Sequence, residues 1–266
     1  EVWMDSGYSA RTRSRLRRLL RAHQPSAVGG LPDISASPMR YVGTESGHPG
    51  PGPIWSTGCQ YGNLSWPGGD PESAQWCPAN CATTLQVGGK WFWEPGARLK
   101  TLAELVRIYH DTVGRNCVLE LDFAIDRMGR VDPLHAERYR ALGTWIRQCY
   151  GTPVAVARGE GTWEVFADIP ASTAVDRIIL QEDLAQGQRV REYVVEAAEA
   201  SAGVTSWRPL SRGRAIGQKR IHIAPAPLAA RRIRLRVEAA VAPPHLTLQV
   251  FRPCREPSEA SLSAYV

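Results

Sequence analysis

The sequence lacks the patterns that identify several large classes of protein. No apolar run approaches the length of a membrane-spanning helix, and no signal-peptide pattern is visible. There is also no glycine-rich phosphate loop, no G-x-S-x-G motif and no arrangement typical of a Cys/His nucleophile. What remains is an ordinary globular composition, 43% hydrophobic and 22% charged over 266 residues, long enough for one large domain or two medium ones.

The chain begins without an initiator methionine, and its first residues already have the pattern of a strand. We therefore expect a fragment or a trimmed product. The absence of a signal peptide then says little about the cellular compartment.

Six cysteines are spread over the chain. Cys77 and Cys81 are not followed by a second Cys or His pair at zinc spacing, so we expect no metal site, and no cofactor is indicated. Cys59 lies in the same loop-rich stretch, where a disulfide is plausible in an oxidising compartment. That stretch also contains the N-glycosylation sequon Asn63-Leu64-Ser65. Together these features favour a secreted protein or one of the secretory pathway, including a lysosome- or vacuole-like compartment.

The net charge of +6 is carried mostly by arginine, and six arginines lie between residues 11 and 21. Such a run is compatible with a nucleic-acid surface. The spacing of Leu16, Leu19 and Leu20 favours instead the outer face of an amphipathic helix. We therefore expect no nucleic-acid partner and no membrane partner, and the oligomeric state stays open.

Residues 1–151 alternate short apolar runs with helical patterns. Strands are expected at 2–4, 25–28, 39–42 and 116–123, and helices at 10–22, 99–112 and 132–150. This alternation predicts a parallel sheet with right-handed crossovers. The segment 46–90 is different, since it is rich in Gly, Pro, Ser and Trp and shows no periodicity. Its aromatic residues, Trp55, Tyr61, Trp66 and Trp76, favour an ordered loop that either grips the faces of sugars or anchors itself in the core.

After residue 151 the pattern changes to short strand-like segments. Several of them alternate apolar and basic residues, as in Ile233 to Val237, which suits a sheet with one solvated face. We expect an all-β sandwich over 152–254 and a polar tail over 255–266, partly disordered.

Two acidic residues follow short apolar strands and each is followed closely by a glycine. Asp5 ends the first strand, and Glu45 follows the strand at 39–42. In a parallel barrel both would point into the mouth at the carboxyl ends of the strands, where catalytic groups lie. Glycoside hydrolysis needs such a pair, one carboxylate as nucleophile and one as acid/base. The alternative is that each acid only caps a following helix. Glu120, inside an apolar run, has no explanation at this level.

Several segments, in the same order along residues 1–254, resemble motifs of the α-L-fucosidases of glycoside hydrolase family 29. These segments are EVWMDSG (1–7), QPSAV (24–28), RYVGTESG (40–47), AELVRIYHDTVGRNCVL (103–119), RIILQEDL (177–184) and IGQKRI (216–221). The resemblance implies an incomplete (β/α) TIM-like barrel over 1–151, followed by a jelly-roll-like β-sandwich over 152–254. Its loop pattern is most similar to the subfamily acting on α-1,3/1,4-linked fucose.

The resemblance also implies a mechanism and a substrate. Asp5 would be the nucleophile of a retaining exo-α-L-fucosidase and Glu45 its acid/base, acting on a fucosylated oligosaccharide or a glycoprotein glycan. Trp91-Phe92-Trp93 matches an aromatic element near the sugar pocket. The candidate substrate-binding residues are Trp3, Trp55, Trp91 and Trp93.

The sequence also departs from the family pattern. Asn80 and Ala82 replace two acids, and Glu120 replaces a leucine. The resemblance further implies that the first strands of the barrel, with histidines and a tryptophan that hold fucose, are absent from this chain. The isolated chain is therefore not expected to be an efficient enzyme. These departures motivate an alternative, a non-catalytic relative that binds fucosylated glycans or serves a structural role.

Overall fold

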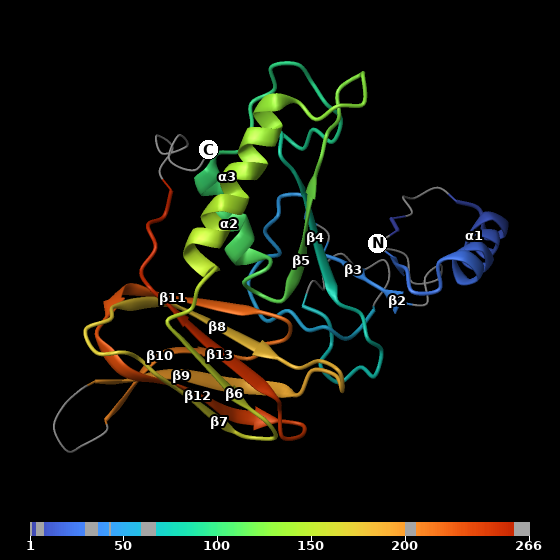
Figure 1. Ribbon diagram of the computed structural model, residues 1–266. Helices are drawn as coiled ribbons and strands as arrows, with labels where there is room; N and C mark the ends of the chain where they lie inside the picture. The colour runs from blue at the N-terminus through green and yellow to red at the C-terminus, as the bar shows by residue number, and fades with distance from the viewer. Residues whose placement is uncertain are drawn as a thin grey trace.

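The computed structural model describes residues 2–3, 8–29, 37–42, 44–59, 68–199 and 206–257. Figure 1 shows two layers of β-structure, a pair of helices with a small sheet beside them, and one helix set apart near the N-terminus. Among the described residues, no helix is both long and apolar enough to cross a membrane.

A three-stranded parallel sheet forms the centre of the first half of the chain. Its strands, in spatial order, are β3 (Arg40–Tyr41), β4 (Ala79–Thr84) and β5 (Cys117–Asp122). A separate parallel pair is made by β1 (Val28–Gly29) and β2 (Ser37–Pro38), and Val2 forms a parallel bridge with Gly29. The parallel pairing predicted for this half is confirmed for these strands.

β4 was not expected, because it lies inside the segment interpreted as one long loop. All six of its residues are buried. Its sequence, ANCATT, has no run of large apolar side chains, so neither hydrophobicity nor period-2 alternation identifies it. Small residues suit this position because the strand is buried on both faces and paired on both edges.

The loop that precedes β4 is organised around a buried arginine. Arg40 donates hydrogen bonds from its guanidinium to the backbone carbonyls of Trp55, Thr57, Gly58 and Cys77. Burial lowers the pKa of Arg40 to about 10, which still leaves it charged at neutral pH. One side chain thus satisfies several loop carbonyls that would otherwise be buried without partners.

Two helices cover the parallel sheet as the sequence predicts. α2 (Leu102–Asp111) begins with a capping box between Thr101 and Glu104, and α3 (Pro133–Tyr150) begins with Pro133 after the cap Asp132. Their apolar faces form one core with Ile179, Ile221 and Phe251 from the second half of the chain. α1 (Ala10–His23) has no buried residue, in keeping with an exposed amphipathic helix.

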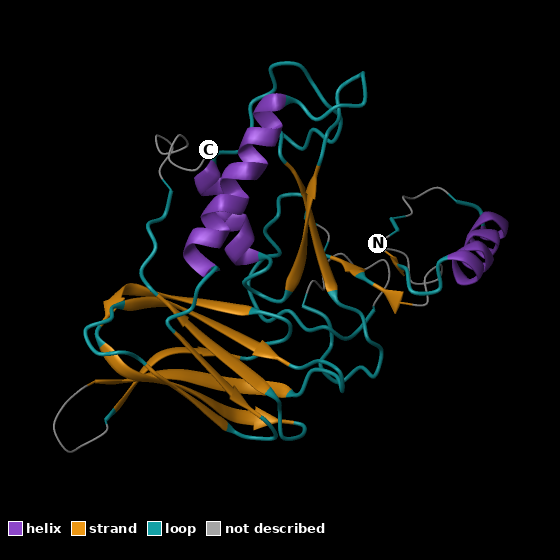
Figure 2. Cartoon of the chain, in the orientation of Figure 1, coloured by secondary structure: helices purple, strands orange, loops and turns teal. Residues whose placement is uncertain are grey.

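The second half contains strands and no helix among its described residues, as Figure 2 shows. The strands are β6 (Ala155–Gly159), β7 (Glu164–Asp168), β8 (Val175–Glu182), β9 (Val190–Glu199), β10 (Trp207–Gly213), β11 (Arg220–Leu228), β12 (Ala230–Ala240) and β13 (Leu246–Phe251). They form two antiparallel sheets, ordered β10-β9-β12-β7 and β11-β8-β13-β6.

The core of this half lies between its two sheets. Ile233, Leu235 and Val237 of β12 point into it, and the arginines between them point outward, as the alternation predicts. The other sheet is covered on both sides, since Ile178 and Leu180 join this core while Ile179 joins the helix core. β10 was not expected, because Pro209 interrupts the strand-like pattern of its sequence. The strand lies at the edge of its sheet, and its register shifts after Pro209.

All six cysteines form disulfides: Cys59–Cys77, Cys81–Cys117 and Cys149–Cys254. The first is a bond within the loop-rich stretch, as the sequence suggested. Cys81 instead bonds to Cys117 on the neighbouring strand β5, with Cα atoms 6.1 Å apart. Strand pairing that sequence spacing does not reveal brings these two residues together.

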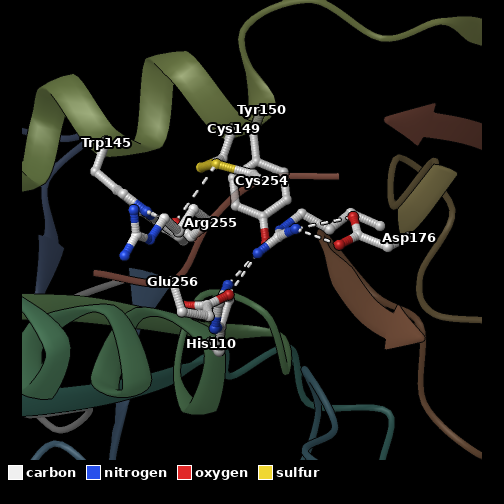
Figure 3. The surroundings of a disulfide bond; sticks show 9 residues. His110, Trp145, Cys149, Tyr150, Asp176, Cys254, Arg255 and Glu256 are labelled. Atoms are coloured by element: carbon white, nitrogen blue, oxygen red, sulfur yellow. Dashed lines mark hydrogen bonds and ion pairs between the residues drawn. A yellow bond between two sulfur atoms is a disulfide. The ribbon is translucent and has the colours of Figure 1, made fainter. Parts of the chain in front are cut away.

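The third disulfide attaches the segment after β13 to α3. Figure 3 shows Cys254 bonded to Cys149, with Arg255 beneath the helix. The indole Nε1 of Trp145 donates to the carbonyl of Arg255 at 3.2 Å, and Glu256 forms an ion pair with the buried Arg177. The beginning of the predicted polar tail is therefore packed on the helix, while residues 258–266 lie outside the described residues.

Candidate active site

Polar side chains lie on one face of the parallel sheet. Tyr41 is aligned with Asn80, and Glu120 is aligned with Ala82. Asn80 is fully buried, and its Nδ2 donates a hydrogen bond to Oε2 of Glu120 at 3.0 Å. Because side chains alternate along a strand, Glu120 and Asp122 share this face of β5. The face therefore carries two carboxyl groups.

Glu45 lies in an exposed turn after β3. Its backbone carbonyl accepts from Oγ1 of Thr83 at 2.9 Å, which attaches the turn to the end of β4. Its carboxylate accepts from the indole Nε1 of Trp91 at 3.0 Å. Burial, followed by the charges of Glu45 and Glu120, raises the pKa of the Tyr41 hydroxyl, which also hydrogen-bonds to Glu45. Tyr41 therefore links the turn to the polar face of the sheet.

The loop that carries Trp91 is held by one buried glutamine. Gln86 donates from Nε2 to the carbonyls of Lys90 and Phe92, at 3.0 and 2.8 Å, and its Oε1 accepts from the backbone N–H of Glu94 at 3.0 Å. These three bonds fix the backbone on both sides of Trp91. The indole is therefore positioned against Glu45 by the fold of the loop.

The other predicted substrate-binding tryptophans have different surroundings. Trp3 is 39% exposed, and its ring meets that of Tyr41 edge-on at 5.7 Å between centroids. Trp3 therefore belongs to the group formed by Glu45, Tyr41 and Trp91. Trp93 donates from Nε1 to Oδ2 of Asp132 at 3.2 Å, which directs it to the start of α3.

Trp55 is not part of this group. It is only 3% exposed, and its ring lies beneath the guanidinium groups of Arg191 and Arg214, at 5.2 and 6.0 Å from the ring centroid. This placement favours the loop-anchoring alternative over contact with sugar. Asp5, Tyr61 and Trp66 lie outside the described residues, so the distance between the two proposed catalytic carboxylates is not defined.

Sequence reasoning overlooked Asp122 as a member of the site. Burial and the neighbouring charge of Glu120 raise the pKa of its carboxyl group, with His135 acting in the opposite direction. Its Oδ2 is buried and has no hydrogen-bond partner among the described residues. The available signal was the spacing of Glu120 and Asp122, which places two acids on one face of a strand.

His110, near the end of α2, is largely buried against α3. Its Nε2 lies 2.7 Å from the hydroxyl of Tyr150, beneath α3. Burial, together with the charge of Arg177, lowers its pKa to about 4, so the ring is neutral at ordinary pH. His110 is therefore a structural residue of the helix core.

The arrangement combines carboxyl groups with aromatic side chains beside the ends of parallel strands. Such a group can exchange protons with a bound substrate and offer apolar ring faces to it. Within the described ranges, no group of three His, Cys, Asp or Glu side chains is placed to hold a metal ion.

Comparison with known proteins points to one kind of enzyme. No family model matches the chain. The rice protein named "Putative alpha-L-fucosidase 1" (Oryza sativa subsp. japonica) is 26% identical over 187 residues, which is 58% of this chain and 35% of that protein. Alpha-L-fucosidase 1 of Arabidopsis thaliana is 21% identical over 244 residues, 76% of this chain and 47% of that protein.

Solved structures agree with these relatives. A Bacteroides thetaiotaomicron structure titled as a putative alpha-L-fucosidase superposes with a TM-score of 0.80 at 25% identity, covering 89% of this chain and 56% of that one. A Ruminococcus gnavus GH29 fucosidase in complex with fucose has a TM-score of 0.77 at 20% identity, covering 96% of this chain and 61% of that one. The second likeness concerns the fold alone.

These comparisons agree with the motifs noted in the sequence. The chain spans 35% and 47% of the lengths of the two curated relatives. Over that portion, the chain is similar in sequence and in fold to the α-L-fucosidases of glycoside hydrolase family 29.

Proposed function

We propose that the chain is part of a retaining exo-α-L-fucosidase. Its substrate would be α-1,3/1,4-linked fucose on an oligosaccharide or a glycoprotein glycan. The observation that carries the proposal is the position of Glu45, held by Trp91 and Tyr41 beside parallel strands of a fold similar to that of α-L-fucosidases.

The mechanism is a double displacement. Glu45 protonates the glycosidic oxygen while Asp5 attacks the anomeric carbon, which releases the glycan and leaves fucose bound to Asp5 as an ester. Glu45 then takes a proton from water, which attacks the ester and releases fucose with retained configuration. The exposed position of Glu45 supports this role, because the acid must reach a leaving group on the solvent side of the sugar.

A hydrogen bond between two residues that depart from the family pattern supports the enzymatic function. Asn80 and Ala82 stand where the family has acids, and Glu120 stands where it has leucine. Asn80 donates to Glu120, and Ala82 is directly paired with Glu120 across the strands. A carboxylate is therefore kept on this face of the sheet, supplied by β5 instead of β4.

The aromatic side chains near Glu45 would form the wall of the sugar site. Trp91 donates a hydrogen bond to Glu45, and the ring of Trp3 meets that of Tyr41, which bonds to Glu45. The C6 methyl group makes one face of fucose apolar, and such a face packs well on an indole.

For the whole fold, we propose that the parallel sheet belongs to a TIM-like barrel that is incomplete in this chain, and that the antiparallel sheets are a jelly-roll-like sandwich. The support is the parallel order β3-β4-β5 with helices α2 and α3 beside it. Three disulfides support a secreted or secretory-pathway protein, since disulfides persist in oxidising compartments.

The alternative is a non-catalytic protein that binds fucosylated glycans. Replacement of two family acids by Asn80 and Ala82 is the observation that favours it. It predicts glycan binding by calorimetry without release of fucose.

The test uses the native polypeptide that contains these residues, with two substrates. Glu45→Gln should lower kcat/KM, which reports the first step, on a branched fucosylated glycan by about a hundredfold or more, because general acid catalysis contributes about that much. The loss should be much smaller on a nitrophenyl fucoside, whose leaving group needs no proton. Asp5→Asn should reduce turnover of both substrates by about several hundredfold, because the covalent step disappears.

Glu160→Gln, an exposed glutamate on the turn between β6 and β7, is the matched control and should leave both rates unchanged. Equal losses of kcat/KM on the two substrates for Glu45→Gln would exclude its role as the acid. Glycan binding with no fucose release by the unaltered protein would favour the non-catalytic alternative.

A further inference from the structure

A cleft rich in arginine lies where the two halves of the chain meet. Its walls come from the loop at Pro51–Pro53, from Arg115 after α2, and from Gly213–Ala215 and Arg220 of the antiparallel half. Its volume is about 390 Å³. None of the lining residues is acidic, whereas three of them are arginines. We call this feature the arginine cleft.

Two of the arginines are held opposite each other by the backbone. Arg115 and Arg220 form an antiparallel bridge, flanked by hydrogen bonds from Ile221 N to Gly114 O and from Asn116 N to Lys219 O, both at 2.9 Å. Side chains of directly opposed residues on paired strands lie about 5 Å apart at Cβ, and like charges in such pairs are destabilising. The fold thus maintains an unfavourable pair of charges at this point.

The charge in the cleft is only weakly offset by neighbouring groups. Burial and then the charge of Arg220 lower the pKa of Arg115, and both effects exceed the opposing effect of Asp111. Asp111 is itself 2.7 Å from Nδ1 of His48. Among the described residues, Arg115, Arg214 and Arg220 have no ion-pair partner within 4 Å.

The hydrogen bonds of the three arginines in the described part of the chain leave part of their donors unpaired. The Nε of Arg220 is buried and has no hydrogen-bond partner within the part of the chain that the structure describes. Arg220 lies beside the hydroxyl of Tyr193, and Arg115 donates from Nη2 to the carbonyl of Gly52 at 2.6 Å, which fixes both side chains. Arg214 is exposed at the rim, with its guanidinium 6.0 Å from the ring centroid of Trp55.

We propose that the arginine cleft binds a tetrahedral oxyanion, either sulfate or phosphate, as the free ion or as an ester on a larger ligand. A guanidinium group presents paired N–H donors that match two oxygens of such an anion, and the anion neutralises the opposed charges.

The arginine cleft is separate from the proposed catalytic group. Arg115 precedes β5, whereas Asp122 ends it, so the two sites lie at opposite ends of a strand that spans about 16 Å. The proposal therefore does not depend on the fucosidase activity. An oxyanion bound here does not occupy the space beside Glu45.

The test is isothermal titration calorimetry of the protein with sodium sulfate and sodium phosphate, at fixed ionic strength maintained with sodium chloride. We expect one anion per chain. Arg220→Gln should weaken binding by at least about tenfold, since it removes a charge-assisted bond. Arg214→Gln, at the exposed rim, should also weaken anion binding, without affecting folding. Arg231→Gln, an exposed arginine on β12, is the matched control and should bind like the unaltered protein.

A second titration uses N-acetylglucosamine 6-sulfate. Binding tighter than that of free sulfate would identify an ester as the ligand, and weaker binding would identify the free ion. Absence of saturable binding to the unaltered protein would overturn the proposal. Equal affinities of the unaltered protein, Arg220→Gln and Arg214→Gln would also overturn it.

Discussion

The three disulfides allow a quantitative test, because the loops that they close do not overlap. The bonded residues are 18, 36 and 105 positions apart, in the order Cys59–Cys77, Cys81–Cys117 and Cys149–Cys254. Each bond therefore restricts a different part of the unfolded chain. Replacing both members of one pair by alanine should release the entropy of that loop alone.

The expected losses follow from loop length. With the chain-entropy relation, the free energy of unfolding falls by about 3, 4 and 5 kcal/mol for the short, middle and long loops at 25 °C. The difference between the longest and the shortest is about 1.6 kcal/mol, from 1.5RT times the logarithm of the length ratio. The longest loop should show an additional loss, because its disulfide keeps Arg255 against α3 and Glu256 against the buried Arg177 of β8.

Urea denaturation of the three double variants, followed by tryptophan fluorescence and by far-UV circular dichroism, provides the measurement. Coincident transitions from the two signals are required before a free energy is taken from either. The variant pair Cys59→Ala, Cys77→Ala is the short-loop control. An equal or larger loss for that pair than for Cys149→Ala, Cys254→Ala would refute the loop-entropy reasoning.

Three further predictions concern single residues. The pKa of His110 is lowered to about 4 in the folded state, so the fold favours the neutral ring. The stability that this preference contributes is complete above pH 6.5 and is lost as the pH falls towards 4. The unfolding free energy should decrease by about 2 kcal/mol between pH 7 and pH 5, and His110→Asn should lack this decrease. The same pH dependence in His110→Asn and in the unaltered protein would contradict the lowered pKa of His110. Asn116 adopts φ 64° and bonds to Ile54 O, Ser56 Oγ and Gln218 N, so Asn116→Ala should cost about 3 kcal/mol or more in urea denaturation. Asn116→Gly should cost about 1 kcal/mol less than the alanine variant, because glycine tolerates this φ, and equal costs would exclude a backbone contribution. Thr101→Ala should lower stability by about 1 kcal/mol by removing the capping box of α2, whereas Thr101→Ser should restore most of it.

The regular elements with local signals were predictable from the sequence. Thr101 and Glu104 form the capping box that their spacing predicts, and Asp132 with Pro133 begins α3 as expected. The alternation in β12 also placed Ile233 inside and its neighbouring arginines outside. These signals are local, since each depends on residues within about one helical turn or a few strand positions.

The elements without local signals were missed. β4 consists of small and polar residues, so nothing in its own sequence distinguishes it from the surrounding loop. β10 contains Pro209 and a bulge, which break the expected alternation. Trp55 matched a sugar-binding residue by type, but only the fold shows that its ring is buried beneath Arg191 and Arg214.

By itself, the sequence determined the helices and strands that have a local signal, the change from a parallel to an antiparallel half, and the likeness to α-L-fucosidases. Only the tertiary structure decided which distant residues meet. The Asn80–Glu120 hydrogen bond, the Cys81–Cys117 disulfide and the Arg115–Arg220 bridge each join residues from separate elements. The physical reason is that such contacts depend on the register between paired strands, and packing of the whole chain sets that register.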